Sequence, residues 1–141
     1  MISFRLHHLG CAVACIEDSL RMYTGAMGFS RVSAIYELAD LKVRVCFVET
    51  APDVFVELVQ ATAADSPASA FLTRRQYYYH ACYVTPDVRA AVAHLEASGY
   101  RLLSLAASEV FAGAEFAFLL TPESALVEIC TEGMFARLLT T

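Results

Sequence analysis

The pattern of hydrophobic and polar positions along the chain occurs twice. One short apolar run begins at His8 and another begins at His80, and each run is typical of a β-strand. Apolar residues at helical spacing follow both runs: Ile16, Leu20, Tyr23 and Met27 in the first half, and Val88, Val92 and Leu95 in the second. Each helical segment is followed by a glycine, Gly28 or Gly99, the residue most tolerant of the left-handed conformation that ends many helices. The two halves therefore correspond at an offset of about 72 residues, the separation of His8 and His80.

Three further strand-like runs follow the helix in each half. They cover residues 30–37, 42–50 and 54–60 in the first half, and 100–105, 115–120 and 125–130 in the second. A short helix is expected from Pro67 to Leu72. The sequence thus predicts an α+β fold in which two tandem βαβββ modules form a cupped mixed sheet. We expect one domain over residues 1–141, built from repeat 1–62 and repeat 74–135 and joined by residues 63–73.

Composition narrows the class of protein. Hydrophobic residues make up 57% of the chain and charged residues 18%, which favours a compact core over disorder and leaves apolar surface for a homodimer interface. The net charge of −5 and the ten Lys and Arg residues argue against a nucleic-acid partner. No apolar stretch approaches the roughly 20 residues that span a bilayer, so no membrane partner is expected. Five cysteines without a CxxC pair predict reduced core residues in a cytoplasmic protein.

Four polar residues stand out because they recur at equivalent points of both repeats. Glu57 follows His8 and Glu128 follows His80 at nearly the same separation, and each glutamate lies in the centre of an apolar strand. A buried carboxylate without a partner costs several kcal/mol, so it must be protonated, ion-paired or bound to a cation. One divalent ion would neutralise two carboxylates and two neutral imidazoles. We therefore predict that His8, Glu57, His80 and Glu128 bind a single divalent metal ion.

Other polar and aromatic residues have more ordinary interpretations. Taken alone, a strand histidine is usually a core or edge residue and a strand glutamate usually faces solvent, so the metal hypothesis depends on the recurrence. His7 is expected at the surface because it alternates with His8, and His94 is expected to be a solvated or helix-packing residue. Arg74 and Arg75 are expected to be solvated, although they lie where a carrier phosphate could be contacted. Four aromatic residues are candidates for lining a pocket but favour core packing: Phe55, Tyr78, Phe111 and Phe118.

The motifs around these residues resemble the vicinal oxygen chelate superfamily, which includes glyoxalase I, methylmalonyl-CoA epimerase, extradiol dioxygenases and antibiotic-resistance binding proteins. The resemblance covers essentially the whole chain. It is carried by residues 6–13, 16–20, 23–29, 43–47, 56–58, 65–72 and 121–129, and it is closest to the epimerase-like members. The epimerase's glycine-rich loop before the seventh strand is only partly present, as Phe111-Ala112-Gly113-Ala114.

This resemblance implies a reaction and a set of roles. His8, Glu57, His80 and Glu128 match the four metal-ligand positions of the family, and the ion could be Zn, Ni, Co, Mn or Fe. The implied activity is a metal-dependent epimerase or isomerase that removes a proton α to a carbonyl of a 2-substituted acyl thioester. Glu57 and Glu128 are the candidate acid and base.

Three alternatives remain open. A glyoxalase I-type lyase acting on a glutathione hemithioacetal would use the same four ligands, although the length of the joining segment and its Asp65-Ser66-Pro67 pattern modestly favour thioesters. An extradiol dioxygenase would need only two histidines and one carboxylate, and Glu57 would then crowd its open site. A non-catalytic binding module typically lacks the ligands that this chain retains. Fold-level kinship does not decide among these reactions.

Overall fold

The computed structural model describes residues 2–139 of the chain, which form two compact units. The N-terminal unit contains residues 8–79 and the last described residues from Arg137 onward. The C-terminal unit contains residues 80–136 and the first residues through His7. Within residues 2–139, no helix has the length and apolar character that a bilayer-spanning segment requires.

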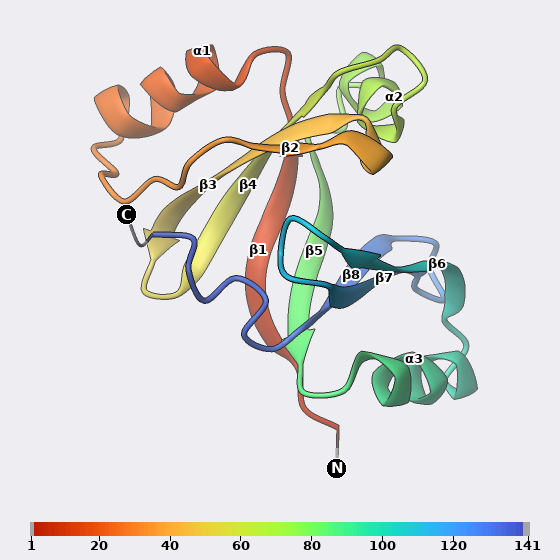
Figure 1. The fold of residues 1–141 in the computed structure, drawn as a ribbon. Coiled ribbons are helices and arrows are strands. Elements are labelled where there is room, and N and C mark those ends of the chain that lie inside the picture. The colour runs from red at the N-terminus through yellow and green to blue at the C-terminus, as the bar shows by residue number, and fades with distance from the viewer. Residues whose placement is uncertain (1, 140–141) are drawn as a thin grey trace. The chain divides into compact units, whose positions relative to one another are not determined.

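The N-terminal unit is built on strands β1 (Arg5–Ala12), β2 (Tyr36–Leu38), β3 (Val43–Ala51) and β4 (Val54–Ala61). Their order is β2-β3-β4-β1, with β1 parallel to β4 and the other pairs antiparallel (Figure 1). Helix α1 (Ile16–Arg21) lies between β1 and β2 in the chain, and α2 (Pro67–Thr73) follows β4. Ile16 is fully buried and packs with Cys46, Val48 and Leu58, so α1 covers one face of the sheet.

The C-terminal unit repeats this plan with strands β5 (Tyr78–Thr85), β6 (Arg101–Ser108), β7 (Ala114–Leu120) and β8 (Leu126–Thr131). Their order is β5-β8-β7-β6, and β5 is parallel to β8 as β1 is to β4. Helix α3 (Val88–Ala97) begins where the Asp87 carboxylate accepts the amide of Ala90 at 3.0 Å, an N-cap. The predicted α+β fold of two βαβββ modules is confirmed, whereas the single-domain organisation and the repeat boundaries stay predictions.

Helix α3 buries the apolar stripe that its spacing predicts. Val88, Val92 and Leu95 are all buried and pack with Leu119 and Ile129 of the sheet. The helix is followed by Gly99 at φ +93°, a conformation that side chains with a Cβ rarely adopt. The predicted glycine stop is therefore confirmed for this helix.

Helix α1 departs from the predicted stripe after one and a half turns. It continues into a π-helical turn, Met22–Ala26, in which the Met27 amide donates to the Met22 carbonyl five residues earlier. The wider turn shifts the phase of the side chains. Tyr23 still packs against the core, but Met27 is 64% exposed, so its predicted place on the apolar stripe is wrong.

Two further expectations need correction. The strand predicted over residues 30–37 is reduced to Tyr36–Leu38 and one isolated bridge between Val32 and Val48, because the backbone of this edge segment pairs with β3 only intermittently. His7 is buried rather than at the surface, since its ring stacks on Phe135 with centroids 4.4 Å apart. Both faces of β1 are covered at that position, which strand alternation alone does not reveal.

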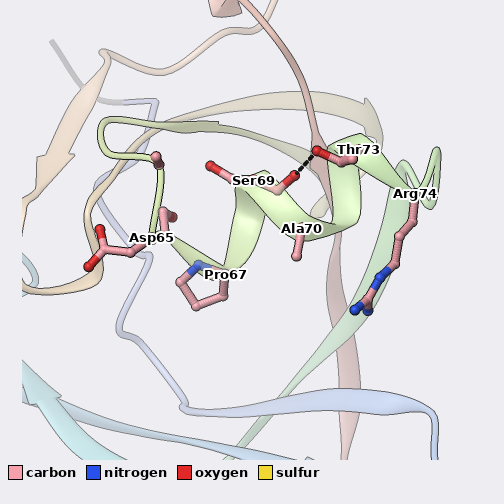
Figure 2. Close-up of a pocket in the computed structure, with 8 residues that line it drawn as sticks. Asp65, Pro67, Ser69, Ala70, Thr73 and Arg74 are labelled. Atoms are coloured by element: carbon pink, nitrogen blue, oxygen red, sulfur yellow. Dashed lines mark hydrogen bonds between the residues drawn. The ribbon is translucent and has the colours of Figure 1, made fainter.

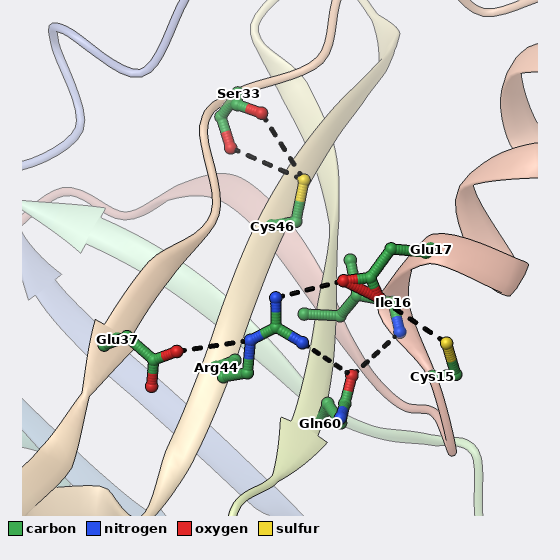
Figure 3. Close-up of polar contacts among 8 residues, drawn as sticks. All are labelled: Cys15, Ile16, Glu17, Ser33, Glu37, Arg44, Cys46 and Gln60. Carbon is green, nitrogen blue, oxygen red and sulfur yellow. Dashed lines mark hydrogen bonds and ion pairs between the residues drawn. The ribbon is translucent and has the colours of Figure 1, made fainter.

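A polar network holds the start of α1 against the sheet of the N-terminal unit (Figure 3). Arg44 on β3 donates to Glu17 of α1 at 3.0 Å and lies 3.3 Å from Glu37 of β2. Gln60 on β4 accepts both from Arg44, at 3.4 Å, and from the amide of Ile16, at 3.0 Å. The first amides of a helix have no acceptor within their own helix. Gln60 therefore supplies a hydrogen-bond acceptor for the Ile16 amide, which would otherwise be buried without one.

Cysteine reactivity should follow burial within the N-terminal unit. Burial raises the pKa of the Cys11 thiol to about 11, so almost none of it is thiolate at neutral pH. Cys15 is partly exposed at the start of α1. We expect brief alkylation of the native protein at neutral pH, followed by peptide mapping, to modify Cys15 first. The rate at Cys11 should rise with pH toward its raised pKa, and equal labelling of the two at neutral pH would contradict this account.

Candidate metal centre

The first predicted ligand pair lies in the N-terminal unit. His8 comes from β1 and Glu57 from the adjacent parallel strand β4, where Glu57 is in register with Gly10. The imidazole Nε2 lies 3.4 Å from a carboxylate oxygen, and the side chains are 0% and 11% exposed. The two residues share one face of the sheet because His8 and Gly10 are two positions apart on a strand.

The second pair repeats this arrangement in the C-terminal unit. His80 comes from β5 and Glu128 from the parallel strand β8, where Glu128 is in register with Cys82. Nε2 of His80 lies 3.2 Å from a carboxylate oxygen of Glu128, with the side chains 2% and 10% exposed. In both units, therefore, the histidine lies two residues before the strand residue that is in register with the glutamate. The structure thus brings each predicted histidine together with its predicted glutamate.

A phenylalanine supports each pair in the same way. Phe47 of β3 is in register with Glu57, and Phe118 of β7 is in register with Glu128. The Phe47 ring meets the His8 ring edge-on at 5.4 Å and 75°. Phe118 meets His80 at 5.5 Å and 84°. These edge contacts restrict the orientation of the imidazoles, as packing around a metal ligand commonly does.

Sequence reasoning missed the part played by Phe47. The signal was present, because Phe47 and Phe118 are separated by nearly the same offset as the two histidines and the two glutamates. From the sequence, Phe118 is predicted only as a pocket or core residue. Phe55 packs on Phe47 and Phe111 packs on Phe135, in agreement with the expected packing role. Tyr78 differs, because it is 62% exposed.

The donor set and its spacing fit a divalent ion. Two ligand atoms that each lie about 2.1 Å from a common ion are about 3.0–3.4 Å apart for octahedral or tetrahedral angles. The nitrogen–oxygen separations of 3.4 and 3.2 Å fall in that range, and they exceed the roughly 2.7–2.9 Å of a charge-assisted hydrogen bond. Each pair therefore has the geometry of two neighbouring ligands, and the binding of one ion by both pairs stays a prediction.

A separate surface hollow lies beside α2 in the N-terminal unit (Figure 2). It is lined by residues 64–67, 69, 70, 73 and 74, which include none of the four predicted ligands. Asp65 on its rim forms an ion pair with Lys42, which lowers the pKa of the Asp65 carboxyl. Arg74 is exposed at the opposite end, and Arg75 is exposed beside it, as expected for solvated arginines.

Comparison with known proteins gives three kinds of similarity. Residues 7–118 match the family model described as the glyoxalase/bleomycin resistance protein/dioxygenase superfamily. An ethylmalonyl-CoA/methylmalonyl-CoA epimerase of Cereibacter sphaeroides is 32% identical over 101 residues, covering 70% of this chain and 74% of the relative.

Solved structures share the fold. A hypothetical protein of Bacillus halodurans superimposes with a TM-score of 0.80 at 24% identity, covering 92% of this chain and 95% of the other. A variant methylmalonyl-CoA epimerase of Streptomyces coelicolor, in complex with 2-nitronate-propionyl-CoA, gives 0.78 at 23% identity, covering 93% of this chain and 99% of the other.

Proposed function

Because the chain belongs to the glyoxalase/bleomycin resistance protein/dioxygenase superfamily, we propose that it is a metal-dependent epimerase acting on a 2-substituted acyl thioester. The observation that carries the proposal is the pair of buried His–Glu contacts, repeated with the same register in both units. The similarity to an ethylmalonyl-CoA/methylmalonyl-CoA epimerase supports the choice of a thioester substrate.

The proposed metal ligands are His8, Glu57, His80 and Glu128. Each imidazole presents Nε2 to a carboxylate, so metal binding through this nitrogen places the imidazole proton on Nδ1. Two carboxylates balance the charge of a divalent ion, and burial strengthens that attraction. When bound, the ion would supply Lewis-acid stabilisation of the negative charge that develops on a substrate oxygen.

The carboxylates also have a role in proton transfer. Epimerisation requires a base that removes the proton from one face of the α carbon and an acid that returns a proton to the other face. Glu57 and Glu128 come from different repeats, and we propose that they fill these two roles.

A lyase acting on a glutathione hemithioacetal is the competing reaction, because it needs the same ligands and the same proton removal. The epimerase is favoured by the relative with 32% identity, which is an ethylmalonyl-CoA/methylmalonyl-CoA epimerase. The homodimer and the cytoplasmic location stay predictions. Light scattering at micromolar concentration tests the first.

The testing experiment measures metal content and proton exchange on the same preparation. The purified protein is incubated with candidate divalent metals, desalted and submitted to elemental analysis. It is then mixed in deuterated buffer with methylmalonyl-CoA or ethylmalonyl-CoA, while proton NMR follows loss of the α-proton signal. A parallel assay uses a glutathione hemithioacetal.

The proposal predicts about one metal ion per chain and exchange of the thioester α proton well above the buffer rate. A variant carrying both Glu57→Ala and His80→Ala should lose the metal and the exchange. Turnover of the hemithioacetal without thioester exchange would assign the lyase reaction instead. Failure of the wild-type protein to retain any metal would refute the four-ligand centre.

A further inference from the structure

Two cysteine sulfurs lie side by side in the C-terminal unit. Cys82 of β5 and Cys130 of β8 are both 0% exposed, and the Cys82 thiol donates to the Cys130 sulfur at 3.4 Å. They sit on adjacent parallel strands, where Cys82 is in register with Glu128 and Cys130 with Val84. A carboxylate oxygen of Glu128 and the two sulfurs all lie within 4.8 Å of one another. Three ligand atoms are therefore gathered on neighbouring strands.

The first repeat lacks this dithiol. Gly10 is in register with Glu57, as Cys82 is with Glu128. Val59 lies two residues after Glu57, as Cys130 lies two residues after Glu128. The fold of the repeat therefore does not need sulfur at either position. The other fully buried cysteine, Cys46, forms hydrogen bonds with Ser33 instead.

We propose that Cys82, Cys130 and Glu128 form a second metal-binding site, which takes a thiophilic cation such as Cd²⁺, Hg²⁺ or Cu⁺. At the roughly 2.3 Å typical of zinc–sulfur bonds, two sulfurs at a tetrahedral angle lie about 3.8 Å apart, a few tenths of an ångström beyond the 3.4 Å observed, and the larger Cd²⁺ requires a somewhat wider separation of the sulfurs. Thiolates prefer such soft ions over the harder ions that suit carboxylates and water. Binding of a divalent ion forms two metal–sulfur bonds and releases the two thiol protons to solvent.

This site shares Glu128 with the proposed catalytic centre, but its other two ligands are the sulfurs of Cys82 and Cys130. The four residues of the catalytic centre contain no sulfur. A sulfur-specific signal therefore separates the two proposals, because it reports the dithiol whether or not the chain is an epimerase. Competition for Glu128 links the sites chemically, and a thiophilic ion should act as an inhibitor of the enzyme.

The experiment uses the full-length protein with all five thiols reduced, as verified by thiol titration in denaturant. Cd²⁺ is added under anaerobic conditions and equilibrated, and the thiolate-to-cadmium charge-transfer absorption is followed in the ultraviolet. The band should grow to saturation at one ion per dithiol. Cys82→Ala and Cys130→Ala should each weaken binding at least tenfold, whereas Cys46→Ala should leave the band unchanged because it removes a buried thiol elsewhere.

X-ray absorption of the Cd²⁺-loaded wild-type protein provides a measurement that does not depend on how the variants fold. Two sulfur ligands per bound ion are expected. A wild-type protein that shows no charge-transfer band, or fewer than two sulfurs around each ion, would overturn the dithiol site. Loss of the band in Cys46→Ala with its retention in Cys82→Ala would do the same.

Discussion

Glu128→Gln is expected to lower kcat/KM for the acyl thioester about 10²- to 10⁴-fold, the usual contribution of a general acid or base. Glutamine keeps the size of the side chain but can neither exchange a proton at neutral pH nor balance the charge of a divalent ion. Steady-state epimerisation and α-proton exchange should therefore fall together. Metal content, measured by elemental analysis, should also decrease because one of two carboxylates is lost.

Glu115→Gln is a matched control for this prediction. Glu115 begins the same hairpin, at the start of β7, but it is partly exposed and forms an ion pair with Arg89 at 2.8 Å. Its replacement should leave kcat/KM and metal content unchanged. Equal losses in both variants would indicate a general effect of charge or stability, and full activity in Glu128→Gln would contradict a proton-transfer role for that residue.

Comparison of Glu57→Gln with Glu128→Gln tests whether one glutamate acts as the base and the other as the acid. If one carboxylate removes the proton and the other returns it, each substitution should impair the two substrate enantiomers unequally. Isotope exchange started from each enantiomer measures this difference. Identical losses for both enantiomers in both variants would limit the glutamates to metal binding.

Phe47→Ala is expected to lower the free energy of unfolding by about 3–5 kcal/mol, the cost of removing a fully buried aromatic ring and leaving a cavity. The Phe47 side chain is 0% exposed and contacts the rings of both His8 and Phe55. Urea denaturation of the metal-free protein measures the effect without a contribution from ligand binding. Because the ring also restrains His8, metal affinity should fall in the same variant.

Phe118→Ala serves as the comparison, since Phe118 makes the equivalent contact with His80 but is only partly buried. Its loss of stability should be smaller, while its effect on metal affinity should resemble that of Phe47→Ala. Phe47→Leu, which retains much of the volume, should cost less than the alanine substitution. An unfolding free energy unchanged in Phe47→Ala would contradict the assigned packing.

The predicted ligand pairs show which site residues an internal repeat can identify from the sequence alone. His8 and His80 stood out only because each preceded a glutamate at nearly the same distance, and the structure places both histidines beside those glutamates. The same offset relates Phe47 to Phe118, but phenylalanine in a strand carries no signal of its own. Its contact with a histidine two strands away became visible only from the pairing of β3 with β4 and of β4 with β1.

The failures have a common physical cause. Met27 fits the helical stripe of Ile16 and Leu20, yet the π-helical turn rotates it into solvent. His7 fits a surface position, yet Phe135, far along the chain, covers it. Helix winding and long-range covering depend on which atoms are available to pack or to hydrogen-bond in the folded chain, and local spacing carries little information about either.

The sequence by itself determined the repeat, the α+β class and the four residues proposed as metal ligands. This was possible because hydrophobic periodicity and a carboxylate within an apolar strand are local features that can be read directly from the sequence. Only the tertiary structure decided that each histidine faces its glutamate at 3.2–3.4 Å, that a phenylalanine restrains each imidazole, and that Cys82 meets Cys130. Those contacts arise from strand register, which joins residues distant along the chain through backbone hydrogen bonds and shared burial.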